Sequence, residues 1–134
     1  MAGEKVSNKL AAQFGYILLG SAMGVNLNSA TNVDTAIAMI DTPTKFRVRA
    51  VAMTNGSINP TTARFTINTA VSAGGTAVVT AVTPSLSSSA VVQDLSIAST
   101  NVITGTGNLY LNLTTAQGAA ATVDVYIYGD IYTA

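Results

Sequence analysis

The chain has no cysteine, no histidine and no tryptophan among its 134 residues. Without a thiol or an imidazole, it lacks a thiolate nucleophile, an imidazole base and the usual ligands of structural zinc. It also has no disulfide that would indicate an oxidising compartment. These absences predict a protein that is not an enzyme and that holds no metal and no cofactor.

Charged residues are scarce as well. Six basic and six acidic side chains make up 9% of the chain and give a formal net charge of +0, whereas ordinary globular proteins are about 25% charged. A dedicated nucleic-acid binder would carry a basic excess, so no nucleic-acid partner is expected. Solubility therefore depends on Thr, Ser, Asn and Gly, and such a neutral surface is well suited to being covered by neighbouring proteins.

Residues 1–30 lack the strand alternation of the rest of the chain, and their last part is rich in Gly, Asn and Ser. We predict an N-terminal arm over 1–30 and one domain over 31–134. The arm carries more apolar side chains than water tolerates without a partner, and Phe14 and Tyr16 are therefore candidate partner-binding residues. We expect the arm to cross to an adjacent subunit.

The apolar stretch 10–22 resembles a signal peptide. Gln13 and Gly15 interrupt it, however, and Glu4 lies where a signal peptide is basic. It is also shorter than the ~20 apolar residues that span a bilayer. We therefore expect no membrane partner and synthesis in the cytoplasm.

From Thr35 onward the sequence consists of short apolar or alternating runs separated by Gly and Pro turns. Such a pattern is typical of an all-β sandwich. The segment 91–97 is either a strand or, over 90–94, a helical turn. The other expected strands are 35–40, 45–53, 63–69, 76–83, 108–114 and 122–133.

Alternation with period two divides these strands into a core face and an outer face. In 122–133, the odd positions are apolar and the even positions carry tyrosine and aspartate. In 45–53, the same alternation places Ala50 and Ala52 inward. The predicted core consists of Phe46, Val48, Phe65, Ile67, Leu109, Leu111, Val123, Val125 and Ile127.

Four of the six cations fall on two strands that we expect to be neighbours. Lys45, Arg47 and Arg49 share one face of 45–53, and Arg64 on the next strand would lie across from them. This surface is a solvated outer face, a docking site for an acidic protein surface, or a site for a polyanion. Arginine suits docking because its guanidinium binds carboxylates in a bidentate manner.

Tyrosines form a second candidate surface. Tyr110, Tyr126, Tyr128 and Tyr132 lie on the outer faces of the last two expected strands. They pack under a loop or the arm, form a subunit interface, or stack on sugars. Tyrosine suits an interface because it offers a large contact area at little cost in conformational entropy.

The segment NLYLNLTTAQGAAATVDVYIYGDIY, residues 108–132, resembles the C-terminal strands of small virion proteins of tailed bacteriophages, especially head decoration (cement) proteins. The resemblance covers roughly residues 60–134 and lies in the small residues, the Ala-Gly-Thr turns and the tyrosine-containing closing strand. It implies a jelly-roll-like sandwich on the capsid exterior. It also implies a homo-oligomer, a dimer or trimer, that has no catalytic activity and binds the major capsid protein.

The expected function is therefore that of a structural virion protein, which binds and stabilises a phage capsid surface. The alternative is a carbohydrate-binding β-sandwich module of a head fibre or tail. The absence of tryptophan, the usual platform for sugar rings, makes this alternative the weaker one.

Overall fold

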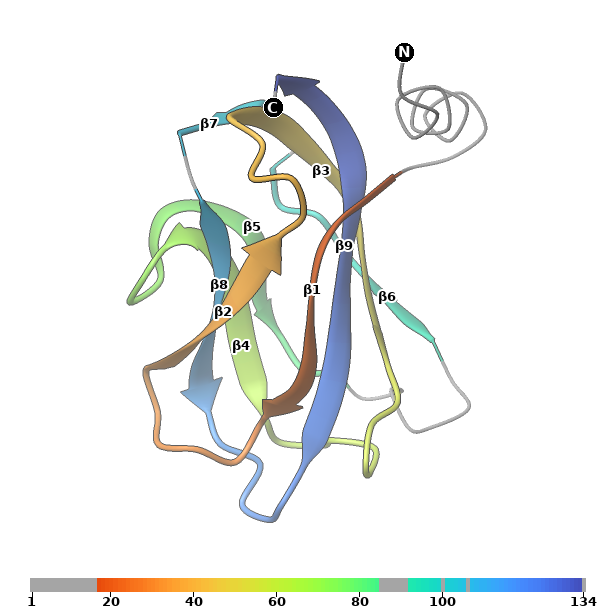
Figure 1. Ribbon diagram of the computed structural model, residues 1–134. Helices are drawn as coiled ribbons and strands as arrows, with labels where there is room; N and C mark the ends of the chain where they lie inside the picture. The colour runs from red at the N-terminus through yellow and green to blue at the C-terminus, as the bar shows by residue number, and fades with distance from the viewer. Residues whose placement is uncertain (1–16, 85–91, 100, 106, 134) are drawn as a thin grey trace.

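The computed structural model describes residues 17–84, 92–99, 101–105 and 107–133. In that part of the chain every element is a strand, so the prediction of an all-β sandwich is confirmed (Figure 1). The jelly-roll subtype stays a prediction. The strands are β1 (Ile17–Asn26), β2 (Val33–Met39), β3 (Lys45–Thr54), β4 (Arg64–Ala70), β5 (Gly74–Val82), β6 (Gln93–Leu95), β7 (Ile103–Thr104), β8 (Asn108–Thr115) and β9 (Thr122–Thr133).

The strands follow the order β5-β4-β8-β2-β1-β9-β3-β6, and β7 also pairs with β3. The sheet folds over at the contact of β1 with β2, where only Gly20–Met39 and Ser21–Ala38 are in register. Figure 1 shows the two resulting layers. The first layer contains β1, β9, β3, β6 and β7, and the second contains β2, β8, β4 and β5. At the opposite edge of the sandwich, the Ala98 amide, after β6, donates to the carbonyl of Val78 on β5 at 2.7 Å and connects the two layers a second time.

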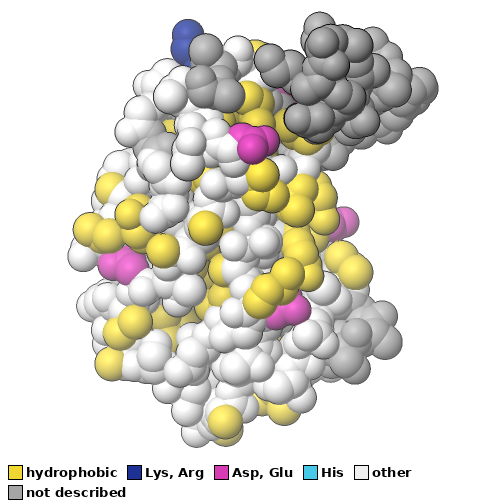
Figure 2. Space-filling model, viewed as in Figure 1, with side chains coloured by type: hydrophobic (Ala, Val, Ile, Leu, Met, Phe, Trp, Pro, Cys, Tyr) yellow, Lys and Arg dark blue, Asp and Glu magenta, His cyan; other side chains and the backbone are white. Residues whose placement is uncertain are grey.

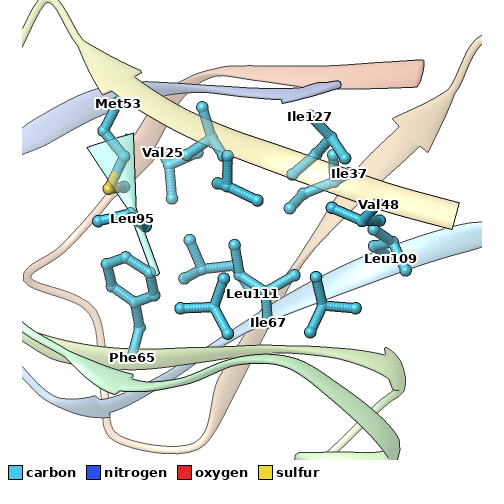
Figure 3. Packing of buried hydrophobic residues seen from close by; sticks show 14 of the residues in the cluster. Val25, Ile37, Val48, Met53, Phe65, Ile67, Leu95, Leu109, Leu111 and Ile127 are labelled. Atoms are coloured by element: carbon cyan, nitrogen blue, oxygen red, sulfur yellow. The ribbon is translucent and has the colours of Figure 1, made fainter. Parts of the chain in front are cut away.

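The core lies between the layers, as the sequence predicts. All nine predicted core residues are at most 1% exposed. In Figure 3, the side chains of Val25 and Ile127 from the first layer face those of Phe65 and Leu111 from the second. The alternation of β9 and β8 therefore identified the buried faces correctly.

The predicted alternation of β3 holds only up to Val48: Ala52 is buried, at 9% exposed, but Ala50 is not, and both lie opposite the outward tyrosines of β9. The register between β3 and β9 shifts between Val48 and Ala50, so that Arg49 is an extra residue. Such a bulge exchanges the two faces of the strand beyond it. Val51 and Met53 consequently enter the core, where each is 0% exposed.

The prediction of an arm is wrong for residues 17–30. β1 pairs with both β2 and β9, and Leu19 and Leu27 are fully buried. The strand lacks period two because its register with β9 shifts twice, after Leu18 and after Ala22. Residues 1–16, with the candidates Phe14 and Tyr16, lie outside the described residues.

The central strand β9 depends on a glycine. Gly129 pairs with Ile17 on β1 and with Val48 on β3. A Cβ at this position would clash with the Arg47 carbonyl oxygen and lie 2.9 Å from Leu19 Cδ1. The absence of a side chain therefore lets Leu19, the extra residue of the β1 bulge, fill this part of the core.

The turn between β4 and β5 is held under strain. Ser72 and Ala73 both have a φ of 56°, in the left-handed region that side chains disfavour. The Ser72 amide donates to Asp34 Oδ2 at 2.9 Å, and Asn68 Nδ2 donates to the Ala73 carbonyl at 3.2 Å. These bonds fasten the turn to the outer side of the second layer.

We predict that Ala73→Gly raises the free energy of unfolding by about 0.5–1 kcal/mol. Relief of the left-handed strain outweighs the added entropy of the unfolded chain. Urea unfolding followed by circular dichroism measures the change. Ala120→Gly is the control, because Ala120 is exposed and has no positive φ, and it should be neutral or destabilising. A loss of stability for Ala73→Gly would contradict this account of the turn.

Candidate functional site

The outer face of the first layer is built on β9. Tyr126 and Tyr128 point away from the core because the alternating residues Val125, Ile127 and Gly129 are buried. Each tyrosine is half-buried and has one partner on either neighbouring strand. Tyr128 lies opposite Leu18 and Ala50, and Tyr126 lies opposite Ser21 and Ala52. The outer face of the first layer, with these six residues at its centre, is called the tyrosine face.

One end of the tyrosine face is cationic. Arg47 Nη2 and Arg49 Nη1 donate to the same oxygen, Asp130 Oδ2, at 3.1 and 3.0 Å. The exposed Lys45 lies at the same end of β3. Three cations and one carboxylate leave this end with a formal charge of +2.

The other end is anionic. Asp124 accepts hydrogen bonds from the Gly24 amide at 2.8 Å and from Asn55 Nδ2 at 3.0 Å, and both donors are neutral. The exposed Asp94 on β6 lies opposite Ala52. Because Ala52 also pairs with Tyr126, Asp94 is level with Tyr126 at the β6 edge of the face. The anionic end itself carries the one formal negative charge of Asp124.

Apolar side chains gather between these ends. Figure 2 shows hydrophobic side chains in a band over β1 and β9. Leu18 is 37% exposed and Met23 is 61% exposed. The Tyr126 hydroxyl donates to Met23 Sδ at 3.4 Å, which holds the methionine against the tyrosine. The middle of the face is therefore both aromatic and uncharged.

The four-cation surface predicted from the sequence does not form. Lys45, Arg47 and Arg49 share an outer face, but Arg64 lies on β4 in the second layer, where it donates to the Ala81 carbonyl at 3.3 Å. The chain crosses between layers after β3, so β3 and β4 are not neighbours. Asp130 binds Arg47 and Arg49, but nothing in the local sequence around Asp130 indicates these two partners.

The tyrosines are divided in the same way. Tyr126, Tyr128 and Tyr132 lie on β9, but Tyr110 lies on β8 in the other layer. β8 and β9 are consecutive along the chain yet are not paired. The expectation that all four tyrosines share one surface is therefore wrong.

Tyr110 belongs instead to the outer face of the second layer. It lies opposite Ala36 and Asn68, and Asn112 in the next row lies opposite Asp34 and Thr66. Asn112 Nδ2 donates to Asp34 Oδ1 at 3.1 Å, and this bond links β8 to β2. This outer side of the second layer is called the asparagine face and comprises Asp34, Ala36, Ala38, Arg64, Thr66, Asn68, Tyr110 and Asn112. Asn68 and Asn112 are themselves buried, at 5% and 1% exposed, whereas Ala36 and Ala38 are exposed.

Other kinds of site find little support in the described ranges. There, no three His, Cys, Asp or Glu residues are grouped so as to hold a metal ion, and no helix is long and apolar enough to cross a membrane. A groove of about 390 Å³ lies between the 101–105 segment and the β4–β5 pair. Its lining is uncharged: Thr69, Thr76, Asn101, Val102, Ile103, Thr104 and Gly105.

Comparison with known proteins gives no family model, no curated protein and no solved structure that matches this chain.

We predict that Asp130→Asn lowers the free energy of unfolding by about 1–2 kcal/mol, because it removes the charge that holds two adjacent guanidinium groups. Asp94→Asn is the matched control on the same face, and its effect should stay within about 0.5 kcal/mol since Asp94 is exposed. Thermal and urea unfolding of both variants measure the difference. Equal effects would show that the Arg47–Asp130–Arg49 cluster adds nothing to stability.

Proposed function

We propose that the protein is a structural, non-enzymatic component of a tailed-phage virion, which binds and stabilises the capsid exterior as a decoration (cement) protein. The major capsid protein is its partner, and synthesis takes place in the host cytoplasm. The proposal is supported by the resemblance of residues 60–134 to such proteins and by the β-sandwich fold that this resemblance implies.

The asparagine face is the surface assigned to the capsid, and its chemistry carries the proposal. Its carboxylate, Asp34, already accepts hydrogen bonds from Asn112 and from the Ser72 amide. A neighbouring protein can therefore cover the middle of this face while both oxygens of this carboxylate keep a hydrogen-bond donor, which lowers the cost of burying it. Tyr110 supplies the aromatic contact that protein interfaces favour.

Two exposed alanines shape the same surface. Ala36 lies beside Tyr110, and Ala38 follows on β2. Their short side chains allow the backbone of a partner to approach the strand closely. Each contact is modest, but a capsid lattice repeats it, and repetition raises the overall strength of attachment.

We predict that Ala36→Lys abolishes or strongly weakens attachment to capsids from which the decoration protein has been removed. The lysine places a charge and a long side chain at the centre of the asparagine face, and we expect a loss of at least about tenfold in apparent affinity. Cosedimentation of protein with capsids measures it. Ala119→Lys is the matched control, because Ala119 is an exposed loop residue away from this face.

Two results would refute the proposal. If the wild-type protein does not sediment with capsids, the decoration role is wrong. If it binds glycans and not capsids, the carbohydrate-binding module of a head fibre or tail replaces it. Equal loss for Ala36→Lys and Ala119→Lys would show that the wrong face was assigned.

A further inference from the structure

Charge is separated by sign on the outer face of the first layer. The cationic end contains Arg47 and Arg49, and the anionic end contains Asp124, while Asp94 lies level with Tyr126 at the β6 edge. On β9, Asp124 and Asp130 each lie three residues from Ile127. At ~3.3 Å per residue, both ends are therefore ~10 Å from the middle of the strand.

This arrangement is complementary to itself. We infer that the tyrosine face binds the tyrosine face of a second copy of this chain. A twofold axis that lies in the interface and runs across the strands places the cationic end of each copy on the anionic end of the other. An axis along the strands would instead place like charges together, so the charge pattern selects antiparallel β9 strands across the interface.

The middle of the face provides the contact surface of this dimer. Tyr126 and Tyr128 of one copy meet Tyr128 and Tyr126 of the other, and tyrosine is favoured at the centres of interfaces. Ala50 and Ala52 lie beside the rings and leave room for them. Dimerisation also covers Leu18, which is 37% exposed.

The same arrangement adds ion pairs between the two copies at both ends of the face. Within one copy, two guanidinium groups donate to a single carboxylate oxygen of Asp130. The partner's Asp124 brings a second carboxylate to this cluster, and arginine binds carboxylates with several parallel hydrogen bonds. Specificity for the antiparallel arrangement follows, because the arrangement with parallel β9 strands juxtaposes like charges.

The inference goes beyond the proposed function, since it concerns the opposite layer of the sandwich and does not require a capsid. The dimer leaves both asparagine faces outward. A protein with two such faces holds a lattice more firmly than a monomer does, because the second contact forms within an already attached complex.

Two variants, each with the sign of one charged side chain reversed, test the inference when they are measured separately and as a mixture. Wild-type protein should dimerise in sedimentation velocity experiments, and the dimer should weaken as salt rises. Asp124→Arg and Arg49→Asp should each weaken self-association at least about tenfold. An equimolar mixture of the two variants should form a heterodimer, because both of its charged contacts are again between opposite charges.

Two controls separate binding from folding. Asp124 also fastens the β1 bulge through the Gly24 amide, so Asp124→Asn is included: it keeps an acceptor oxygen, loses the charge and should still weaken the dimer. Arg64→Asp reverses a charge on the other layer and should leave dimerisation unchanged. Circular dichroism confirms that every variant is folded.

A wild-type protein that stays monomeric up to millimolar concentration would overturn the inference. Folded variants that fail to form the heterodimer would also overturn it, as would an equal effect of Arg64→Asp and Arg49→Asp. A monomer that still sediments with capsids would refute the dimer alone and leave the decoration role standing.

Discussion

The close packing of three strands at Gly129 is the constraint on which the rest of the structure depends. β9 lies between β1 and β3, and each of these two strands has a bulge next to this glycine. β9 pairs on both edges, and its alternation buries Val123, Val125, Ile127 and Gly129 while Tyr126 and Tyr128 lie on the tyrosine face. A side chain at position 129 would separate the strands and disturb both faces.

Much of the fold follows from local pattern. The alternation of β9 and β8 predicts their buried faces because the extra residues Leu19 and Arg49 lie on the neighbouring strands, so that 123–129 keep period two, and because β8 pairs with β2 in regular register. β1 was not recognised because its two register shifts move apolar residues out of period two. For the same reason, the alternation of 45–53 does not show that Ala50 and Ala52 lie level with the outward tyrosines: a bulge depends on the neighbouring strand, and one strand's sequence does not reveal it.

The candidate surfaces were predicted only in part, because the sequence does not show which strands share a layer. Consecutive strands β3 and β4, and β8 and β9, cross between layers, which separates Arg64 from Arg47 and Tyr110 from Tyr126. Gln117 fastens the two crossings to each other: its Oε1 accepts from the amides of residues 61–63 at 3.0–3.1 Å. The result is a sandwich with two distinct outer faces, one with opposite charges at its two ends and one built from amide, hydroxyl and alanine side chains around Tyr110 and Asp34.

The most direct test of the central role of Gly129 is the stability of Gly129→Ala relative to Gly107→Ala. A methyl group at Gly129 meets the Arg47 carbonyl oxygen, whereas one at Gly107 has nothing within 4 Å. We expect Gly129→Ala to lower the free energy of unfolding by about 3 kcal/mol or more, and Gly107→Ala to be neutral or slightly stabilising. A loss below about 0.5 kcal/mol at Gly129 would contradict the packing of β9 between β1 and β3.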